Sequence, residues 1–339
     1  MSERVHVRAL VLAVVLLGAA CTLPGPKPTR IAPDLSGAAD PPSVGLLQQQ
    51  LSDDARLDDV GVSLLRAAVP QCTARTRRAG FRLANVATFT RPWQASATTL
   101  AFTDTVQVVS VAKGSGADRA GVRAADRVVS IDGVPATPGS RIVEAMRARV
   151  ATAAGAGAPH VTVVVRRDGR ETSHTVPLDS SCALTFMSWR DDAPNAWSDG
   201  RTVAVTTGML AYAHADDDLA VVLAHEIAHA VILGSAERSG RRQLVDASVD
   251  LATSAVALAT DDPWLRMKGA RPQSPASEAD EQRADDLTRQ LLLRTGHAAS
   301  PHDFWRRLQL LDPAGVPYAR LHPLSMTRII RMDDSPTSR

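Results

Sequence analysis

Residues 221–233 read Val-Val-Leu-Ala-His-Glu-Ile-Ala-His-Ala-Val-Ile-Leu, an apolar run that carries His225, Glu226 and His229. At about 100° of rotation per residue, the two histidines lie on one helix face a single turn apart, with Glu226 just around the helix. Neutral imidazoles at this spacing can hold one zinc ion, while a carboxylate that does not ligate the metal takes a proton from the water that zinc activates. The run therefore predicts a zinc centre with Glu226 as its general base.

The helix has a start and a stop in the sequence. Asp216 or Asp217 can cap its N-terminus, and Gly234 is expected to end it in the left-handed conformation. The alternative to a metal site is a helix with two ordinary histidines. Buried His and Glu side chains without partners cost free energy in such an apolar setting, and a metal removes that cost.

The composition of the whole chain limits the classes of function that we expect. A chain of 339 residues is long enough for two domains. The net charge is +2, 22% of the residues are charged and 4% are aromatic. Neither a basic stripe nor base-stacking platforms are indicated, so we expect no nucleic-acid binding.

The first residues have the organisation of an export signal. Arg4 and Arg8 precede an apolar stretch at 9–20 that is too short to span a bilayer, and Cys21 follows it. The small residues before Cys21 resemble a bacterial lipoprotein cleavage box, although Gly18 stands where leucine is usual. We expect an exported protein of the periplasm or cell envelope, anchored to a bacterial membrane by lipid on Cys21. An ordinary secreted protein and an uncleaved N-terminus are the alternatives.

Two cysteines remain after Cys21. In an oxidising compartment, Cys72 and Cys182 are expected to form a disulfide that closes a long loop, the alternative being two buried thiols.

Helices and strands alternate in blocks along the chain. Apolar positions at helical spacing predict one or two amphipathic helices at 44–69 and a buried helix at 244–260. Strands are predicted at 106–111, 128–131, 161–165, 172–176 and 202–206, with a helix at 141–150. The strand at 202–206 runs toward the metal helix and is expected to pair with substrate backbone, unless it is an ordinary strand.

The β-rich middle of the chain resembles a PDZ domain. Val106–Val122 and the following Ala125-Asp126 fit the bacterial pattern of strand, Gly-Ser-Pro-Ala turn, short helix and Gly-Asp step, with Gly116 in place of proline and Ala125 in place of glycine. PDZ domains bind extended peptides at a sheet edge. The loop that captures a peptide carboxylate is expected at 100–104, the alternative being a purely structural domain.

A second segment can supply the third metal ligand. Ser277 and Asp280 have capping-box-like spacing and Gly296 closes the helix that they begin. Within it, Glu281 and Asp285 lie one turn apart on the same face. Glu281 can complete a site of two histidines and one glutamate, and Asp285 can accept a hydrogen bond from a ligating histidine. Carboxylates on a surface helix are usually just solvated.

The sequence from about 180 to 330 resembles the gluzincin family that includes the HtpX heat-shock protease, the CAAX prenyl protease and BepA-type proteases. The residues that carry the resemblance are Asn195-Ala, Thr207-Gly-Met-Leu, His225–His229, the Ser277–Asp285 helix, Phe304-Trp-Arg-Arg and His322–Arg328. The resemblance implies Glu281 as the third ligand. It also implies that His322 lies near the metal, either stabilising the oxyanion or acting as a fourth ligand that blocks the site, and that Arg328 orients this segment or touches the tetrahedral intermediate.

Together these features predict an α+β protein, a mainly helical zincin-type metallopeptidase with a small β-rich PDZ-like domain inserted. The expected segments are a signal peptide (1–21), a Pro-rich linker (22–43), an N-terminal helical segment of the peptidase (44–100), the PDZ-like domain (101–179) and the peptidase domain (180–332).

The expected activity is zinc-dependent hydrolysis of internal peptide bonds in unfolded or extended envelope proteins, with one zinc per chain and catalytic roles for Glu226 and His322. The alternative is a peptide-binding, chaperone-like envelope protein whose zinc site is blocked by His322.

Overall fold

The computed structural model of the chain describes residues 43–236, 276–298, 300–311, 316–323 and 325–333. The expected export signal with Cys21, nearly all of the Pro-rich linker and the predicted helix at 244–260 lie outside these residues. Within them, none of the helices combines the length and the apolar character needed to cross a membrane.

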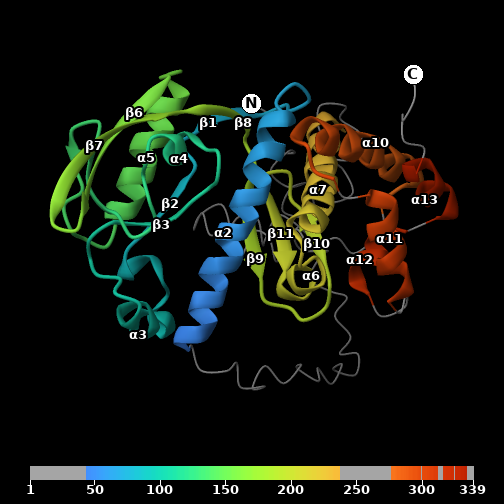
Figure 1. Cartoon of the computed structure of the whole chain (residues 1–339), viewed down its shortest axis with the longest axis horizontal. Helices are drawn as coiled ribbons and strands as arrows, with labels where there is room; N and C mark the ends of the chain where they lie inside the picture. The colour runs from blue at the N-terminus through green and yellow to red at the C-terminus, as the bar shows by residue number, and fades with distance from the viewer. Residues whose placement is uncertain (1–42, 237–275, 299, 312–315, 324, 334–339) are drawn as a thin grey trace, which may run out of the picture. The chain divides into compact units, whose positions relative to one another are not determined.

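Helices and strands mix throughout the described residues (Figure 1). The helices are α2 (Val44–Ala67), the 3-10 helix η1 (Val86–Thr88), α3 (Arg91–Thr99), α4 (Gly116–Arg119), α5 (Ile142–Gly155), α6 (Thr207–Tyr212), α7 (Asp216–Ala236), α10 (Glu278–Thr295), α11 (Pro301–Leu310), α12 (Pro317–Leu321) and α13 (Met326–Asp333). The strands are β1 (Arg75–Arg78), β2 (Phe81–Ala84), β3 (Gln107–Val111), β4 (Arg127–Ile131), β5 (Val134–Pro135), β6 (His160–Arg167), β7 (Arg170–Pro177), β8 (Asp179–Cys182), β9 (Thr185–Trp189), β10 (Ala196–Ser198) and β11 (Thr202–Thr206). The predicted α+β class is confirmed.

Helix α2 is one continuous amphipathic helix. The Ser43 side chain caps its N-terminus by accepting a hydrogen bond from the backbone N–H of Leu46 at 3.2 Å. Apolar side chains at helical spacing, among them Leu57, Val60 and Leu64, are buried. This face packs against α7 and β9, so α2 belongs to the same core as the predicted metal helix.

The PDZ-like strands form a six-stranded antiparallel sheet in the order β2-β3-β4-β6-β7, with β5 paired to β4. Strand β3 has neighbours on both sides, and β2 lies at the edge. A peptide can add only to a free edge, so the loop expected at 100–104 leads into a central strand and does not border an edge. That expectation was wrong because residues 81–84, which precede the expected domain start at 101, already join the sheet.

Gly116 explains one departure from the PDZ pattern. It begins α4, where a side chain added to its Cα would put Cβ 1.9 Å from the carbonyl oxygen of Pro177. The backbone of β7 therefore approaches too closely for any other residue, and the proline of the pattern would not fit.

The chain enters and leaves the PDZ-like sheet through one pair of strands. Strands β1 and β8 pair antiparallel, from Arg75 opposite Cys182 to Arg78 opposite Asp179. Beside this ladder, Cys72 and Cys182 form a disulfide that joins positions 110 residues apart, with their Cα atoms 5.7 Å from each other. The ladder and the disulfide hold both ends of the inserted domain at one place.

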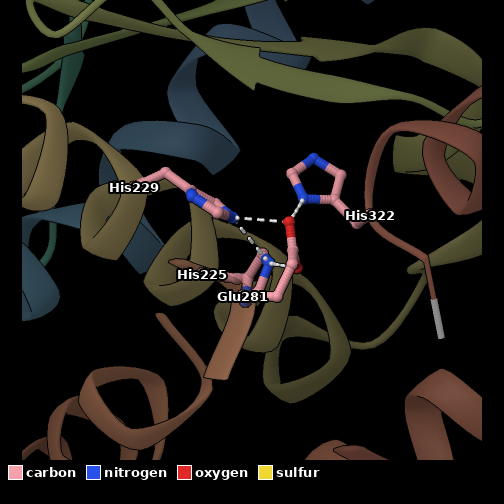
Figure 2. Close-up of side chains that lie close together, drawn as sticks. All are labelled: His225, His229, Glu281 and His322. Carbon is pink, nitrogen blue, oxygen red and sulfur yellow. Dashed lines mark hydrogen bonds and ion pairs between the residues drawn. The ribbon is translucent and has the colours of Figure 1, made fainter. Parts of the chain in front are cut away.

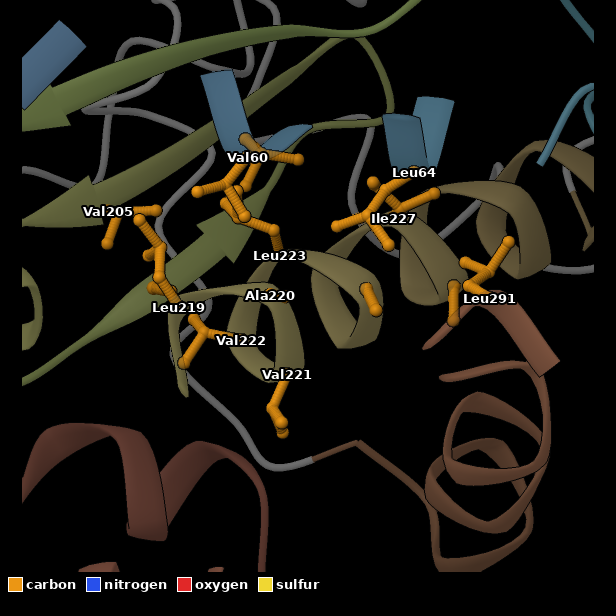
Figure 3. Packing of buried hydrophobic residues seen from close by; sticks show 14 of the residues in the cluster. Val60, Leu64, Val205, Leu219, Ala220, Val221, Val222, Leu223, Ile227 and Leu291 are labelled. Atoms are coloured by element: carbon orange, nitrogen blue, oxygen red, sulfur yellow. The ribbon is translucent and has the colours of Figure 1, made fainter. Parts of the chain in front are cut away.

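Helix α7 runs through the middle of the larger core. Its Leu219, Leu223 and Ile227 are fully buried, in a cluster to which Leu64 of α2 and Leu291 of α10 also belong (Figure 3). The acidic residues Asp216–Asp218 occupy its first turn, where their negative charges interact favourably with the positive end of the helix dipole.

The predicted stop of α7 at Gly234 was wrong. The helix continues to Ala236. Glycine lowers helix stability by only about 1 kcal/mol relative to alanine, so the hydrogen bonds of the preceding turns can carry the helix through it.

We expect the disulfide to be a main support of the inserted domain. Replacing Cys72 and Cys182 together by serine should lower the free energy of unfolding by about 3–5 kcal/mol, because a long loop regains its freedom in the unfolded chain. Denaturant titration followed by circular dichroism measures this. The wild-type protein in reductant should match the variant, and an unchanged unfolding midpoint in both would show that the bridge does not stabilise the fold.

Candidate active site

Helix α7 holds three polar side chains inside the apolar core. His225 and His229 lie one turn apart, and Glu226 lies beside them on the helix. Their exposed fractions are 0%, 8% and 1% for His225, His229 and Glu226. The Nε2 atoms of the two histidines face each other at 3.1 Å. Two buried imidazoles that turn the same ring atom toward one point are arranged as ligands to a single ion.

Helix α10 brings Glu281 to that point. Ser277 caps this helix and Gly296 ends it in the left-handed conformation, as the sequence predicted. The carboxylate oxygens of Glu281 lie 3.3 Å from Nε2 of His225 and 3.4 Å from Nε2 of His229 (Figure 2). Donors about 2.0–2.1 Å from a tetrahedral zinc ion lie about 3.3 Å from one another. Oε2 faces His225 and Oε1 faces His229, so each histidine lies from the Glu281 carboxylate at the spacing of two ligands of one zinc ion.

His322 follows α12 and turns toward the same group (Figure 2). Its Nδ1 lies 3.0 Å from Oε1 of Glu281, and its Nε2 lies 3.5 Å from Oε1 of Glu226. One ligand atom from each of His225, His229, Glu281 and His322 lies within 4.8 Å of all the others. His322 thus reaches the expected metal ligands and the expected general base at once.

Electrostatics keeps these groups in the forms that bind a cation. Burial lowers the pKa of His225 well below its usual value, which favours the neutral imidazole that can bind a metal ion. Burial raises the pKa of Glu281, but hydrogen bonds from the three histidines outweigh it and hold that pKa far below its usual range. Burial also lowers the pKa of His229, while Glu281 and Glu226 raise it more, giving a net increase. A bound cation would take the place of that proton.

Arg328 of α13 is a buried guanidinium that braces the ligands. It donates to both carboxylate oxygens of Asp285 at 2.8 Å and to the carbonyl oxygen of Pro323 at 2.6 Å. The Nη2 atom that donates to Oδ1 of Asp285 also lies 2.8 Å from Oε2 of Glu281. The guanidinium is thus engaged with groups of the protein, which supports the orienting role expected for it over contact with an intermediate.

Asp285 does not make the hydrogen bond to a ligating histidine that the sequence suggested. Its Oδ1 lies 3.4 Å from Nδ1 of His225, and Nδ1 has no hydrogen-bond partner among the described residues. The two hydrogen bonds from Arg328 already orient the Asp285 carboxylate. Asp285 acts on Glu281 through Arg328 more than on the histidine directly.

Tyr318 is a site residue that sequence reasoning missed. Its hydroxyl donates to Oε1 of Glu226 at 2.9 Å, and its ring stacks on Trp305, 5.4 Å between centroids. Trp305 in turn meets the ring of His225 at 5.2 Å. The available clue was that Tyr318, one of two tyrosines in the chain, precedes His322 by one helical turn.

Strand β11 is not the strand that can pair with a substrate. The sheet order is β10-β11-β9, so β11 has neighbours on both sides and its backbone groups are engaged. The expectation for residues 202–206 was therefore wrong. The edge strand that contacts α7 is β10.

Comparisons with known proteins match both the peptidase part and the PDZ-like part of the chain to protein families. Residues 174–335 match the family model of peptidase family M48, and residues 107–167 match that of the PDZ domain. No curated protein matches the chain. The HtrA3 PDZ domain bound to a phage-derived ligand is 20% identical with a TM-score of 0.22, and the match covers 31% of this chain and 88% of that one. The HtrA-type protease AlgW with decapeptide is 22% identical with a TM-score of 0.23, over 31% of this chain and 30% of that one.

The site geometry fits Glu281 as a metal ligand, and metal analysis can test this role. Glu281→Gln should lower zinc affinity at least about 100-fold, because loss of a mere supporting residue already costs 10- to 100-fold. Zinc per chain is measured by atomic emission after dialysis against a weak chelator. The matched control is Glu278→Gln, an exposed carboxylate on the same helix, which should keep its zinc. Equal zinc in both variants would remove Glu281 from the ligand set.

Proposed function

Because the chain is a metallopeptidase of family M48 that carries a PDZ domain, we propose that it is a zinc-dependent endopeptidase acting on unfolded or extended proteins of the cell envelope. The observation that carries this proposal is the meeting of His225, His229 and Glu281, from two helices far apart in sequence, beside Glu226.

These side chains fit zinc. Two imidazole nitrogens and a carboxylate, all buried, form one of the common ligand sets of catalytic zinc. Zinc bound there supplies Lewis acidity, which makes a water molecule acidic near neutral pH and polarises a peptide carbonyl.

Glu226 is the proposed general base and acid. Its carboxylate takes the proton of the attacking water and delivers it to the leaving amine nitrogen. The hydroxyl of Tyr318 donates to one of its oxygens at 2.9 Å and fixes the direction of the carboxylate. Tyr318 is thus a positioning residue for Glu226, and Trp305 supports its ring by stacking.

His322 has two candidate roles. Donation from a ring nitrogen to the oxyanion of the tetrahedral intermediate would stabilise the transition state. The same ring lies within ligand distance of the other three donors, and this favours a second candidate function, a peptide-binding, chaperone-like protein whose zinc site is closed by His322. Both functions require an extended polypeptide, which can pair with the edge strand β10 beside α7.

We expect Glu226→Gln to keep its zinc and to digest denatured casein about 10²- to 10⁴-fold more slowly than the wild type. The substitution preserves the shape of the side chain and removes its capacity to accept the proton. Gel-based digestion and zinc analysis of the same preparation measure both properties. Removal of zinc by a chelator should also stop the wild-type reaction, and added zinc should restore it.

The outcomes separate the two functions. Full activity of Glu226→Gln would reject Glu226 as the base. Absence of cleavage by the wild type and also by His322→Ala, with zinc bound in both, would reject the peptidase and leave the blocked, peptide-binding protein.

We also propose that the protein is exported and anchored to a bacterial membrane through lipid on Cys21, on the basis of the N-terminal sequence. Cys21→Ser should move the protein from the membrane fraction to the soluble fraction, since one acylated cysteine would be its anchor. Cell fractionation with immunoblotting measures this. Membrane association that persists in the variant would contradict the anchor.

A further inference from the structure

A cavity of about 390 Å³ lies at one end of the six-stranded sheet, in a part of the PDZ-like domain that the proposed function does not use. Two segments line it: the loop at 123–126 with the start of β4, and the end of β6 with the turn that follows it, at 166–169. The volume is within the range of sites that bind small molecules. Residues of the metal site and of the edge strand β2 do not line this cavity.

The cavity carries an excess of positive charge. Its lining contains four arginines and two aspartates; they are Arg123, Arg127, Arg166, Arg167, Asp126 and Asp168. One pair is already neutral, because Arg167 donates to both carboxylate oxygens of Asp126 at 2.6 Å. The backbone N–H of Arg123 donates to the same carboxylate at 2.8 Å. Asp126 is only 1% exposed, so it holds this end of the sheet together and is not available to a ligand.

Three arginines of the cavity have no buried counter-ion. The side chain of Arg123 forms no hydrogen bond or ion pair with another residue of the described ranges. Arg127 donates through Nη1 to the hydroxyl groups of Thr103 at 3.2 Å and Thr105 at 2.8 Å, which are neutral.

The acids near the third arginine compensate little of this charge. Arg166 pairs with Glu171, but both side chains are about half exposed, and surface pairs of this kind contribute little. Asp168, which is exposed, can compensate only one arginine. The cavity therefore offers positive charge that an anion can satisfy.

Two of these arginines are held next to each other by the sheet. Arg127 of β4 and Arg166 of β6 are directly opposite in the antiparallel register. They lie on the face away from the core, since their neighbours Val128 and Val165 are buried. Side chains at opposed positions have Cβ atoms about 4.5–5.5 Å apart, and like charges there are destabilising. An anion between the two guanidinium groups would remove this repulsion.

The backbone around the cavity leaves room for a ligand. Ala124, Ala125 and Gly169 line it, and their side chains are too small to fill it. Ala125 has φ of +70°, a left-handed conformation that favours glycine, and it stands where the PDZ pattern has glycine. Its N–H donates to the carbonyl oxygen of Val108 at 2.9 Å, which holds the loop in this conformation. Strained backbone of this kind is concentrated at functional sites.

We propose that this cavity binds a phosphate group, held by the guanidinium groups of Arg123, Arg127 and Arg166. Guanidinium groups match phosphate oxygens through paired, charge-assisted hydrogen bonds. A phosphate group has more acceptor oxygens than a carboxylate, so it can engage three guanidinium groups at once. The site is separate from the proposed peptide capture and hydrolysis.

Two sources can supply this group, the headgroup of an anionic phospholipid and a soluble phosphate compound. Both present the phosphoryl oxygens that the arginines recognise. A headgroup would hold the PDZ-like domain against the membrane to which the proposed lipid on Cys21 attaches the chain.

The test is isothermal titration calorimetry of the full chain in a chloride buffer of about 0.1 M ionic strength. The probes are inorganic phosphate, acetate and glycerophosphoglycerol, which is the headgroup of phosphatidylglycerol without its acyl chains. We expect saturable binding of at least one phosphate probe with a Kd of about 1 mM or tighter, and acetate should bind at least about tenfold more weakly. Tighter binding of glycerophosphoglycerol identifies a lipid headgroup as the source, and tighter binding of inorganic phosphate identifies a soluble compound.

Variants locate the site. Arg123→Gln and Arg127→Gln should each weaken binding at least about tenfold, through loss of a charge-assisted hydrogen bond. The matched control is Arg170→Gln, which removes the same charge from an exposed arginine of β7 that does not line the cavity, and it should bind like the wild type. Because the Arg123 side chain has no partner among the described residues, its replacement should leave folding intact, and circular dichroism verifies this.

Three results would overturn the proposal. They are absence of saturable binding by both phosphate probes, acetate binding as tight as that of the better phosphate probe, and equal weakening by Arg123→Gln and Arg170→Gln. The last result would show a general effect of charge and not a site. None of these measurements involves hydrolysis, so failure here is distinct from failure of the peptidase assignment.

Discussion

The burial of an ionisable cluster inside an apolar core is the constraint on which the rest of the structure depends. His225, His229 and Glu281 are almost without solvent contact and lie among leucine, isoleucine and alanine side chains. Charges and polar groups in such a place need partners. Each neighbour of the cluster supplies one. Arg328 compensates Glu281 and Asp285, and a cation at the centre would satisfy the histidine nitrogens.

The need of buried polar groups for partners also explains how the C-terminal helices are held in place. Helices α12 and α13 are short, and their own hydrogen bonds would not hold them in isolation. Tyr318 and Arg328 attach them to Glu226 and Asp285 of the long helices. His322 lies between these two attachment points, so its approach to the metal ligands is set by contacts on either side of it in the chain.

The sequence predicted the parts that obey local rules. The spacing of His225 and His229 is a property of one helix, and the cap at Ser277 and the stop at Gly296 are properties of another. The strands of the PDZ-like domain followed from alternation and turn residues. Glu281 was chosen among neighbouring carboxylates by family resemblance, because helical spacing alone does not show which face is buried. No local sequence pattern identifies Tyr318 as a site residue.

By itself the sequence determined the α+β class, the elements and the residues able to ligate a metal, because periodicity, capping and spacing act within a few residues. Only the tertiary structure decided which strand edges stay free. Residues 202–206 became a central strand and residues 81–84 an edge, and hydrogen bonding between segments distant in the chain leaves no mark on either segment. It also decided that Arg328 braces Asp285. Such meetings depend on how helices and sheets pack, since packing brings together residues that no local pattern connects.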